Sequence, residues 1–347
     1  MNLRRMALLG ISACILVSFV VVSAGCGRRT EPGASAPSLT RAHVSTTPSV
    51  TRVRLSTSKN AWCSLTLIAD SKGYFREEGL NVELSYTDGG RYCLDALLSD
   101  SADLGNIVEL NLAFLGFSGN KTVVVVANTV KSTAMGIVAR KSSGIEKLSD
   151  LAGKRLAFTP ATQGDLFVHR LFKKNNMDLA TVQVQKLQPK AIAPALASGA
   201  IDAASTWEPF LYACMRTLGT NAIIFRDPNA HVGYMHLAGR TVWVKQNPDA
   251  VKAALRAFRK AELFASAHPE EAQVLVAKLI NADVKEVKDT WQYHQLQLTL
   301  DAGELINAIK VCGEMIQSGD PEYASKTLPD YTAYVDATSF NAVDFSK

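Results

Sequence analysis

Short runs of apolar and β-branched residues alternate along this chain with segments in which apolar residues recur every three or four positions. The runs predict strands and the periodic segments predict helices. Strands that alternate with helices indicate βαβ units and mainly parallel sheets. The strands are expected at 53–56, 82–86, 121–129, 137–139, 155–158, 182–187, 203–206, 223–225 and 237–244, and the helices at 65–78, 94–98, 163–175 and 192–198.

Two further features complete this pattern. The four consecutive valines 123–126 are typical of a strand that is buried on both faces of a sheet. From residue 248 onward the periodicity predicts an almost entirely helical tail, with helices at 249–268, 270–279, 284–293 and 302–318. The whole pattern therefore predicts two α/β lobes followed by helices.

The first 25 residues have the pattern of a secretory signal peptide. Arg4 and Arg5 precede an apolar run over 6–22, and the small residues 23–25 come directly before Cys26. This arrangement resembles the bacterial lipobox, in which the cysteine is acylated and becomes the new N-terminus, although Ser23 stands where that motif usually has Leu, Val or Ile. The alternative is an uncleaved anchor, since a 17-residue apolar run is at the short limit of a spanning helix. Both interpretations place the folded part outside the cytoplasm.

Composition separates the next segment from the rest and excludes one class of partner. Residues 26–52 are rich in Ser, Thr, Pro, Ala and Arg without apolar periodicity, which predicts a flexible tether. The whole chain is 47% hydrophobic and 20% charged, an ordinary globular balance. Its formal net charge of +5 is small and scattered, and it forms no basic stripe of the kind that binds nucleic acid.

The cysteines leave two interpretations open. Cys14 lies in the signal segment and Cys26 at the proposed acylation site, so four remain in the folded part: Cys63, Cys93, Cys214 and Cys312. An exported compartment permits disulfides, but spacing cannot fix their pairing, and buried free thiols are the alternative. No CxxC pattern suggests zinc.

Several motifs occur in an order that resembles a known family. The segment L-I-A-D-S-K-G-Y-F-R-E-E-G-L-N-V at 67–82 is similar to the opening of periplasmic solute-binding proteins for taurine, alkanesulfonates and nitrate, whose superfamily also binds thiamine-pyrimidine precursors. The resemblance covers residues 53–265. The later motifs are A-D-L-G-N-I at 102–107, L-S-D-L-A-G-K-R-L-A at 148–157, L-Q-P at 187–189, A-I-D-A-A at 200–204 and W-E-P at 207–209.

This resemblance implies a fold and a function. The fold is the two-lobed type II periplasmic-binding-protein fold, with each lobe a mainly parallel sheet flanked by helices and two hinge strands between them. Lobe 1 would comprise 53–134 and 238–347, and lobe 2 would comprise 135–237. The function implied is that of a monomeric lipoprotein, anchored in the bilayer through Cys26, which captures a small organic anion such as taurine or an alkanesulfonate for the membrane permease of an ABC importer. No cofactor or metal is expected.

Candidate binding residues lie in loops that follow strands, because ligands of open α/β sheets bind at the carboxyl ends of strands. Four such loops are 58–62, 88–92, 106–109 and 159–165. In the last, small and hydroxyl residues at a helix start leave N–H groups free to bind an anion, whereas simple N-capping by Thr162 or Asp165 is the alternative. The residues expected to contact ligand are Asn60, Trp62, Arg91, Asn106, Ile107, Thr133, Thr159, Thr162, Gln163, Gly164, Trp207 and Glu208.

The pair Trp207 and Glu208 suggests how a zwitterion would be held. An aromatic wall beside a carboxylate suits a ligand with a cationic part, so the sulfonate of a taurine-like molecule would lie at 162–164 and its amine near Glu208. A tryptophan buried in the core is the alternative. The two hinge segments are expected at 132–136 and 234–238, since a strand pattern resumes after each.

Catalytic chemistry finds little support in the sequence. The six histidines are dispersed; His231 and His236 are five residues apart, but a hinge or surface role is favoured over a shared metal. The chain has no GxSxG, HExxH, Walker A or GxGxxG motif. Two alternatives remain: a biosynthetic enzyme related to thiamine-pyrimidine synthesis on the same fold, and an extracellular sensor domain.

Overall fold

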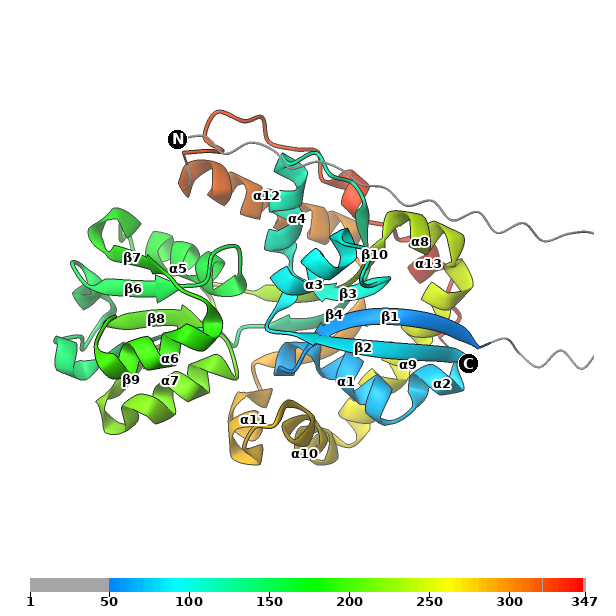
Figure 1. Cartoon of the computed structure of the whole chain (residues 1–347), viewed down its shortest axis with the longest axis horizontal. Helices are drawn as coiled ribbons and strands as arrows, with labels where there is room; N and C mark the ends of the chain where they lie inside the picture. Colours follow the sequence, from blue (N-terminus) through cyan, green and yellow to red (C-terminus); the bar gives the residue numbers. More distant parts are fainter. Residues whose placement is uncertain (1–49, 320, 346–347) are drawn as a thin grey trace, which may run out of the picture. The chain divides into compact units, whose positions relative to one another are not determined.

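Two β-sheets organise the part of the chain that the computed structural model describes, residues 50–319 and 321–345 (Figure 1). The signal segment, Cys26 and most of the expected tether lie outside these residues. Sheet A has the strand order β11-β4-β10-β3-β1-β2, and sheet B has the order β7-β6-β8-β5-β9. Sheet A consists of β1 (Thr51–Ser58), β2 (Leu80–Thr87), β3 (Leu104–Ile107), β4 (Val123–Ser132), β10 (Gly233–Arg240) and β11 (His294–Thr299). Sheet B consists of β5 (Gly136–Arg140), β6 (Arg155–Phe158), β7 (Gln183–Lys186), β8 (Ala203–Thr206) and β9 (Ala222–Phe225).

Several helices begin where the sequence carries a start signal. For example, Pro248 and Pro269 each occupy the first helical position of a helix, where the missing N–H costs nothing. No described helix is both long and apolar enough to cross a bilayer. The helices are α1 (Ser64–Ser71), α2 (Tyr74–Glu77), α3 (Gly90–Leu98), α4 (Glu109–Phe117), α5 (Gln163–Lys174), α6 (Pro189–Ser198), α7 (Phe210–Leu218), α8 (Thr241–Gln246), α9 (Pro248–Ala267), α10 (Pro269–Ile280), α11 (Val284–Trp291), α12 (Ala302–Gly319) and α13 (Thr338–Asn341).

Sheet A is covered by helices on both faces, as the valine run predicts. Val123 and Val125 belong to one core cluster with residues of α3, α4 and α12, whereas Val124 and Val126 belong to a second cluster with residues of α1 and α9. Successive side chains of a strand point to opposite faces, so each valine of β4 is buried on one side or the other.

Sheet B follows the same rule on a smaller scale. Val138 and Ala157 pack in a cluster with residues of α6 and α7, while their neighbours Ile137 and Leu156 pack in the cluster that contains α5. Figure 1 shows α6 and α7 beside the green strands of this sheet. The predicted α/β class is therefore confirmed.

Both sheets are mixed and not mainly parallel as expected, because the strands next to the chain crossings run antiparallel to their neighbours. β1 is parallel to β2 and β3, and β6 is parallel to β7 and β8. β4 and β10 form an antiparallel pair in sheet A, and β5 and β9 form one in sheet B. The chain crosses from β4 to β5 at 133–135 and returns from β9 to β10 at 226–232, so the two crossings begin and end on adjacent strands.

The first crossing lies where the sequence predicts it, and three other expectations need correction. The second crossing is at 226–232 and not at 234–238, because the latter residues already pair with β4 and β3 inside β10. The strand expected at 237–244 ends at Arg240, where α8 begins. The expected all-helical tail contains the strand β11, which pairs with β4. The sequence pattern also did not predict α4 or α7 as separate helices.

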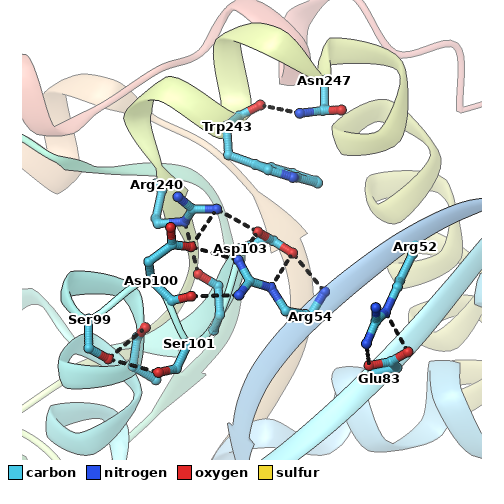
Figure 2. Close-up of polar contacts among 12 residues, drawn as sticks. Arg52, Arg54, Glu83, Ser99, Asp100, Ser101, Asp103, Arg240, Trp243 and Asn247 are labelled. Carbon is cyan, nitrogen blue, oxygen red and sulfur yellow. Dashed lines mark hydrogen bonds and ion pairs between the residues drawn. The ribbon is translucent and has the colours of Figure 1, made fainter. Parts of the chain in front are cut away.

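An equivalent ion pair fixes the amino-terminal side of the parallel strands in each sheet. In sheet A the backbone N and side-chain Nε of Arg54 donate to Asp103 Oδ2 at 2.9 and 3.1 Å, and its Nη2 donates to Oδ1 at 2.7 Å. In sheet B the same three atoms of Arg155 donate to Asp202 at 3.0, 3.0 and 2.8 Å. We call each pair an Arg–Asp clasp; Figure 2 shows the one in sheet A.

Candidate functional site

A cavity of about 30 Å³ lies at the carboxyl ends of parallel strands from both sheets. Its walls come from the loops that follow β1, β2 and β3 of sheet A and β6 and β8 of sheet B, together with one residue of β10. This is the edge at which ligands bind in open α/β sheets. The lining residues are Asn60, Trp62, Gly89, Gly90, Arg91, Tyr92, Val108, Thr162, Gln163, Trp207 and Met235.

Half of the expected binding residues line this cavity. They come from four separate loops that the fold brings together: Asn60, Trp62, Arg91, Thr162, Gln163 and Trp207. Asn60 is also the N-cap of a short 3₁₀ turn, in which its Oδ1 accepts a hydrogen bond from the backbone N of Trp62 at 3.1 Å. That bond fixes the backbone at the start of the turn that carries Trp62.

Two expected residues of β3 lie in the core. Asn106 is fully buried, and its Oδ1 accepts hydrogen bonds from the hydroxyls of Thr57 and Thr66 at 2.7 and 2.8 Å. Ile107 is buried in the apolar cluster on one face of sheet A. Both residues are inside β3 and not in the loop after it, which is why neither lines the cavity.

Three more expected residues have structural contacts instead. Thr133 lies in the first crossing, where its backbone N donates to Tyr293 O at 3.0 Å. The hydroxyl of Thr159 donates to Leu187 O at 2.8 Å. Gly164 packs so tightly against β8 that an added Cβ would lie 3.0 Å from Ser205 O.

Glu208 faces away from the cavity, contrary to expectation. Its carboxylate accepts a hydrogen bond from the backbone N of Tyr212 at 3.0 Å and forms an ion pair with Arg226 at 3.2 Å. Burial raises the pKa of Glu208 to about 7, even though Arg226 opposes the shift. Its neighbour Trp207 lines the cavity, so these two consecutive side chains point to opposite sides of the loop.

Two helix starts with free N–H groups face the cavity. α3 begins after Gly89, which has no side chain to cap it, and α5 begins after Thr162, which makes no side-chain cap. The Thr162 hydroxyl donates backward to Thr159 O at 2.7 Å, and Asp165 accepts from Ala161 N outside the helix. The N-capping alternative is thus wrong for the first turn of α5. Uncapped helix starts attract anions through their free N–H groups and the helix dipole.

Aromatic rings form much of the remaining wall. Trp62, Tyr92 and Trp207 all line the cavity, and the Trp62 Nε1 is a buried donor without a hydrogen-bond partner among the described residues. Glycines allow these rings to come close: a Cβ at Gly233 would lie 2.7 Å from Trp62, and a Cβ at Gly89 would lie 3.2 Å from Trp207. The adjacent pair Gly89-Gly90 was the signal in the sequence for this close approach. Val108 and Met235 gave no such signal.

Gln163, at the start of α5, connects the cavity to a buried carboxylate at the start of α4. Its Nε2 donates to Glu109 Oε2 at 2.9 Å, and its Oε1 has no partner among the described residues. Glu109 is completely buried, and the same Oε2 accepts from the backbone N of Tyr234 at 3.3 Å. Burial by itself would raise the pKa of Glu109, but the nearby His236, whose Nε2 lies 3.7 Å from Glu109 Oε2, outweighs it and the pKa is lowered. The sequence gave no sign of this contact, which joins residues 54 positions apart.

Further contacts join the two sheets around the cavity. The Tyr92 hydroxyl donates to Gln188 Oε1, Lys190 pairs with Asp88 at 2.8 Å, and Asn111 Nδ2 donates to Ala161 O at 3.2 Å. Arg91 is half-exposed and lies 3.7 Å from Asp95, so its charge is partly satisfied.

A larger groove of about 520 Å³ lies on the other side of Arg91. It is lined by one face each of α3, α4, α5 and α12, including Leu94, Phe114 and His169. Few of the expected residues lie there, and the uncapped helix starts and the unpartnered polar atoms belong to the smaller cavity. The smaller cavity is therefore the better candidate site, in spite of its size.

The thiols and histidines do not form a second chemical centre. Cys63, Cys93, Cys214 and Cys312 are buried free thiols, and among the described residues no group of three or more His, Cys, Asp or Glu is arranged to hold a metal ion. Burial, together with the charge of the neighbouring Arg170 guanidinium, lowers the pKa of His231 to about 3.

Several known proteins are similar to this chain in sequence and in fold. The family model described as "NMT1/THI5 like" matches residues 63–272. A protein of Brucella abortus (strain 2308) named as a binding protein is 31% identical over 229 residues, which are 63% of this chain and 68% of that protein. A protein of Bacillus subtilis (strain 168) named as an aliphatic sulfonates-binding protein is 26% identical over 232 residues, 64% of this chain and 68% of that protein.

A solved structure confirms the fold. The alkanesulfonate-binding protein SsuA from Xanthomonas axonopodis pv. citri superposes with a TM-score of 0.70 at 18% identity, covering 82% of this chain and 98% of that one. The type II periplasmic-binding-protein fold expected from the sequence is thus confirmed. The matched range 63–272 also agrees closely with the range over which the motifs suggested a resemblance. This chain belongs to the NMT1/THI5-like family of proteins.

Proposed function

We propose that this protein is an extracytoplasmic solute-binding lipoprotein of an ABC importer, which captures a small organic anion of the taurine or alkanesulfonate type. The observation that carries the proposal is the meeting of two uncapped helix starts, those of α3 and α5, at one cavity. Helix α3 packs on sheet A and helix α5 packs on sheet B. An anion between their starts would therefore contact both lobes. The names of the relatives, which include aliphatic sulfonate binders, support the same class of solute.

The rest of the cavity suits the organic part of such a solute. Three aromatic rings provide apolar walls, and the Trp62 Nε1 offers a further donor to an acid group. Pockets for organic ligands typically have volumes of roughly 300–1,000 Å³. The cavity of about 30 Å³ is far smaller, so the walls must separate before a solute can enter.

Separation of the walls is a hinge motion in this proposal. The two crossings at 133–135 and 226–232 lie next to each other between the sheets, and bending there would move the loops of sheet B away from those of sheet A. Closure over the solute would restore the contacts at the rim, such as Tyr92 with Gln188. The permease of the importer would then recognise the closed form.

A thermal-shift screen tests the solute class. Taurine, longer alkanesulfonates, nitrate and thiamine precursors would be added separately to the purified protein. A ligand at about 100 times its Kd stabilises by about 2.7 kcal/mol, which raises the Tm of a chain of this size by roughly 5 °C. We expect such a shift with at least one organosulfonate. No shift with any of these solutes would contradict the binding proposal.

A pair of variants locates the site of binding. Thr162→Phe places a bulky ring at the start of α5 in the cavity wall, so the shift should disappear while the unliganded protein stays folded. Thr220→Phe makes the same change at an exposed position just before β9, and this variant should keep the full shift. An unchanged shift in Thr162→Phe would exclude this cavity as the anion site.

The lipid anchor is tested separately, since Cys26 lies outside the described residues. Mass spectrometry of the mature protein should find residues 1–25 removed and Cys26 acylated. An intact Met1 or an unmodified Cys26 would contradict the anchor and leave the solute proposal unaffected.

A further inference from the structure

Gln163 is placed between the cavity and a buried charge that does not itself touch the cavity. The Glu109 carboxylate can only accept hydrogen bonds, so the Gln163 amide must present its NH₂ group to Glu109. The amide oxygen then points away from Glu109. Gln163 lines the cavity, is only 6% exposed, and its Oε1 has no partner among the described residues.

Glu109 remains a source of negative charge in this arrangement. Its side chain is fully buried at the start of α4, and its Oε1 likewise has no partner among the described residues. His236 is the nearest titratable neighbour, with its Nε2 3.7 Å from Glu109 Oε2. That distance is too long for a strong hydrogen bond, whereas the bond from Gln163 at 2.9 Å is short.

The hydrogen bond transmits this charge to the cavity. A donor group bonded to a carboxylate is polarised, and a chain of hydrogen bonds in a buried site strengthens each member. The negative end of the Gln163 amide dipole is therefore reinforced where it meets the cavity. An unsatisfied buried acceptor also carries a free-energy cost, which a donor from the solute would remove.

The cavity thus offers both hydrogen-bond donors and a hydrogen-bond acceptor. The starts of α3 and α5 and the Trp62 Nε1 offer N–H groups, which suit an acid group. The Gln163 Oε1 offers an acceptor, which suits a hydrogen-bond donor. Glu208, the expected partner of an amine, is turned towards Arg226 and supplies nothing to this cavity.

We infer that Glu109, acting through Gln163, makes this site prefer a solute that carries an ammonium group in addition to its acid group. Glu109 is a positioning residue in this role, because it orients and polarises Gln163 without lining the cavity. The inference rests on the proposed function, since it concerns the selectivity of the same site.

Two probes that differ only by the amine test this inference. Isothermal titration calorimetry would give the Kd of 2-aminoethanesulfonate and of ethanesulfonate for the wild-type protein. A hydrogen bond between a charged and a neutral group typically changes affinity about ten- to hundred-fold, so we expect the amino compound to bind at least about ten times more tightly. Equal affinities would overturn the inference and leave the proposed function standing, whereas no binding of either probe would overturn both.

Variants then test which carboxylate is responsible. Glu109→Gln keeps the shape of the side chain and removes its charge, so the ratio of the two Kd values should fall to within about two-fold while ethanesulfonate binding changes little. Glu208→Gln should leave the ratio as it is in the wild-type protein. A ratio that survives Glu109→Gln, or that is lost only in Glu208→Gln, would overturn the inference.

Two further measurements guard against a purely structural effect. Glu304→Gln makes the same change at an exposed glutamate that accepts from the Tyr234 hydroxyl at 2.5 Å, and it should leave both Kd values unchanged. If Glu109→Gln does not fold, Gln163→Met removes the amide at similar size, and the ratio of the two Kd values should fall to within about two-fold, whatever the absolute affinity for ethanesulfonate. A retained ratio in Gln163→Met would contradict the role of Gln163.

Discussion

Sheets A and B carry the same Arg–Asp clasp, but only sheet A extends it into a larger cluster. In both sheets an arginine of a parallel strand bonds an aspartate that directly precedes another strand, through its backbone N and two side-chain nitrogens. In sheet B, within the described part of the chain, only the hydroxyl of Ser143 joins the pair, at 3.1 Å from Asp202. In sheet A, Arg240 donates to the same Asp103 at 2.7 Å, and Asp100 pairs with both arginines (Figure 2).

This difference follows the path of the chain. The strands of sheet B come from one continuous stretch, 136–225, so their neighbours are close in sequence. Sheet A is interrupted by that whole stretch, and its strand β10 returns from the second crossing. Arg240 ends β10 and bonds Asp103 across 137 residues of sequence, which ties the returning strand to the part of the sheet that precedes the interruption in the sequence. A discontinuous sheet is thus held by the larger cluster.

The largest expected effect distinguishes the two clasps directly. Asp103→Ala leaves two partly buried arginines without their main acceptor, so the free energy of unfolding should fall by about 2–4 kcal/mol. Asp202→Ala leaves one arginine that is more exposed, and the loss should be about 1–2 kcal/mol. Urea unfolding followed by circular dichroism would measure both. Equal losses would show that the added members of the sheet A cluster contribute nothing.

Glu208 should show the opposite pH dependence from the clasps. Its pKa of about 7 lies above its ordinary value of 4.5, so the folded state takes up a proton more readily than the unfolded state. Stability should therefore fall by about 1–3 kcal/mol as the pH rises from 4.5 to 7 and then level off. In Glu208→Gln this fall should disappear. Unfolding midpoints at pH 5, 6, 7 and 8 that decline equally in both proteins would contradict the assignment.

Acid should weaken both clasps over a window that is set by their aspartates. Burial alone would raise the pKa of Asp103, but the hydrogen bonds of Arg54 outweigh it and hold the pKa at about 2, and the hydrogen bond of Arg155 likewise holds the pKa of Asp202 at about 2. Because these values are below the ordinary 3.8, the clasps contribute fully above about pH 4 and lose about 1–2 kcal/mol each as the pH falls towards 2. In Asp103→Asn, stability should fall less steeply between pH 4 and 2 than in the wild-type protein. An identical slope would contradict the assignment of that pKa to Asp103.

The smallest effect on stability is expected for an exposed ion pair that Figure 2 draws near the sheet A clasp. Arg52 and Glu83 pair at 2.6 Å on adjacent strands of sheet A, close to the clasp, but both side chains are about half-exposed or more (Figure 2). Exposed pairs of this kind contribute little to stability, because water and salt screen the two charges and both side chains lose conformational freedom. Glu83→Ala should thus leave the urea midpoint nearly unchanged. A loss as large as that of Asp202→Ala would mean that burial does not explain the ranking.

The sequence predicted most elements of both sheets, because burial on two faces leaves a clear apolar run. β6 and β8 were predicted with their correct ends. β11 was missed because it is an edge strand with few buried positions, embedded between helices, and its pairing with β4 is set by distant residues. The second crossing was misplaced because β10 begins at Gly233, before its apolar positions.

The candidate site was predicted at the level of loops and not of side chains. The rule that ligands lie at strand ends selected the loops that contribute Trp62, Arg91 and Gln163. It could not show that Glu208 faces Arg226, since Trp207 and Glu208 follow the same strand. It selected the loop 106–109, which contains Glu109, but it could not show that Glu109 bonds Gln163, because that contact joins the separate helices α4 and α5. Local pattern specifies where a loop begins, but the packing of distant elements decides which way each side chain points.

Hydrogen–deuterium exchange with and without the best solute from the screen tests the central claim most directly, because it reports on the two sheets separately. If one anion is held between the starts of α3 and α5, the backbone amides of 90–91 and of 163–165 should both exchange more slowly at saturation. Protection at both helix starts is the result we predict. Protection at only one of them, or at neither while the solute still binds, would contradict the claim that both sheets hold the solute in this cavity.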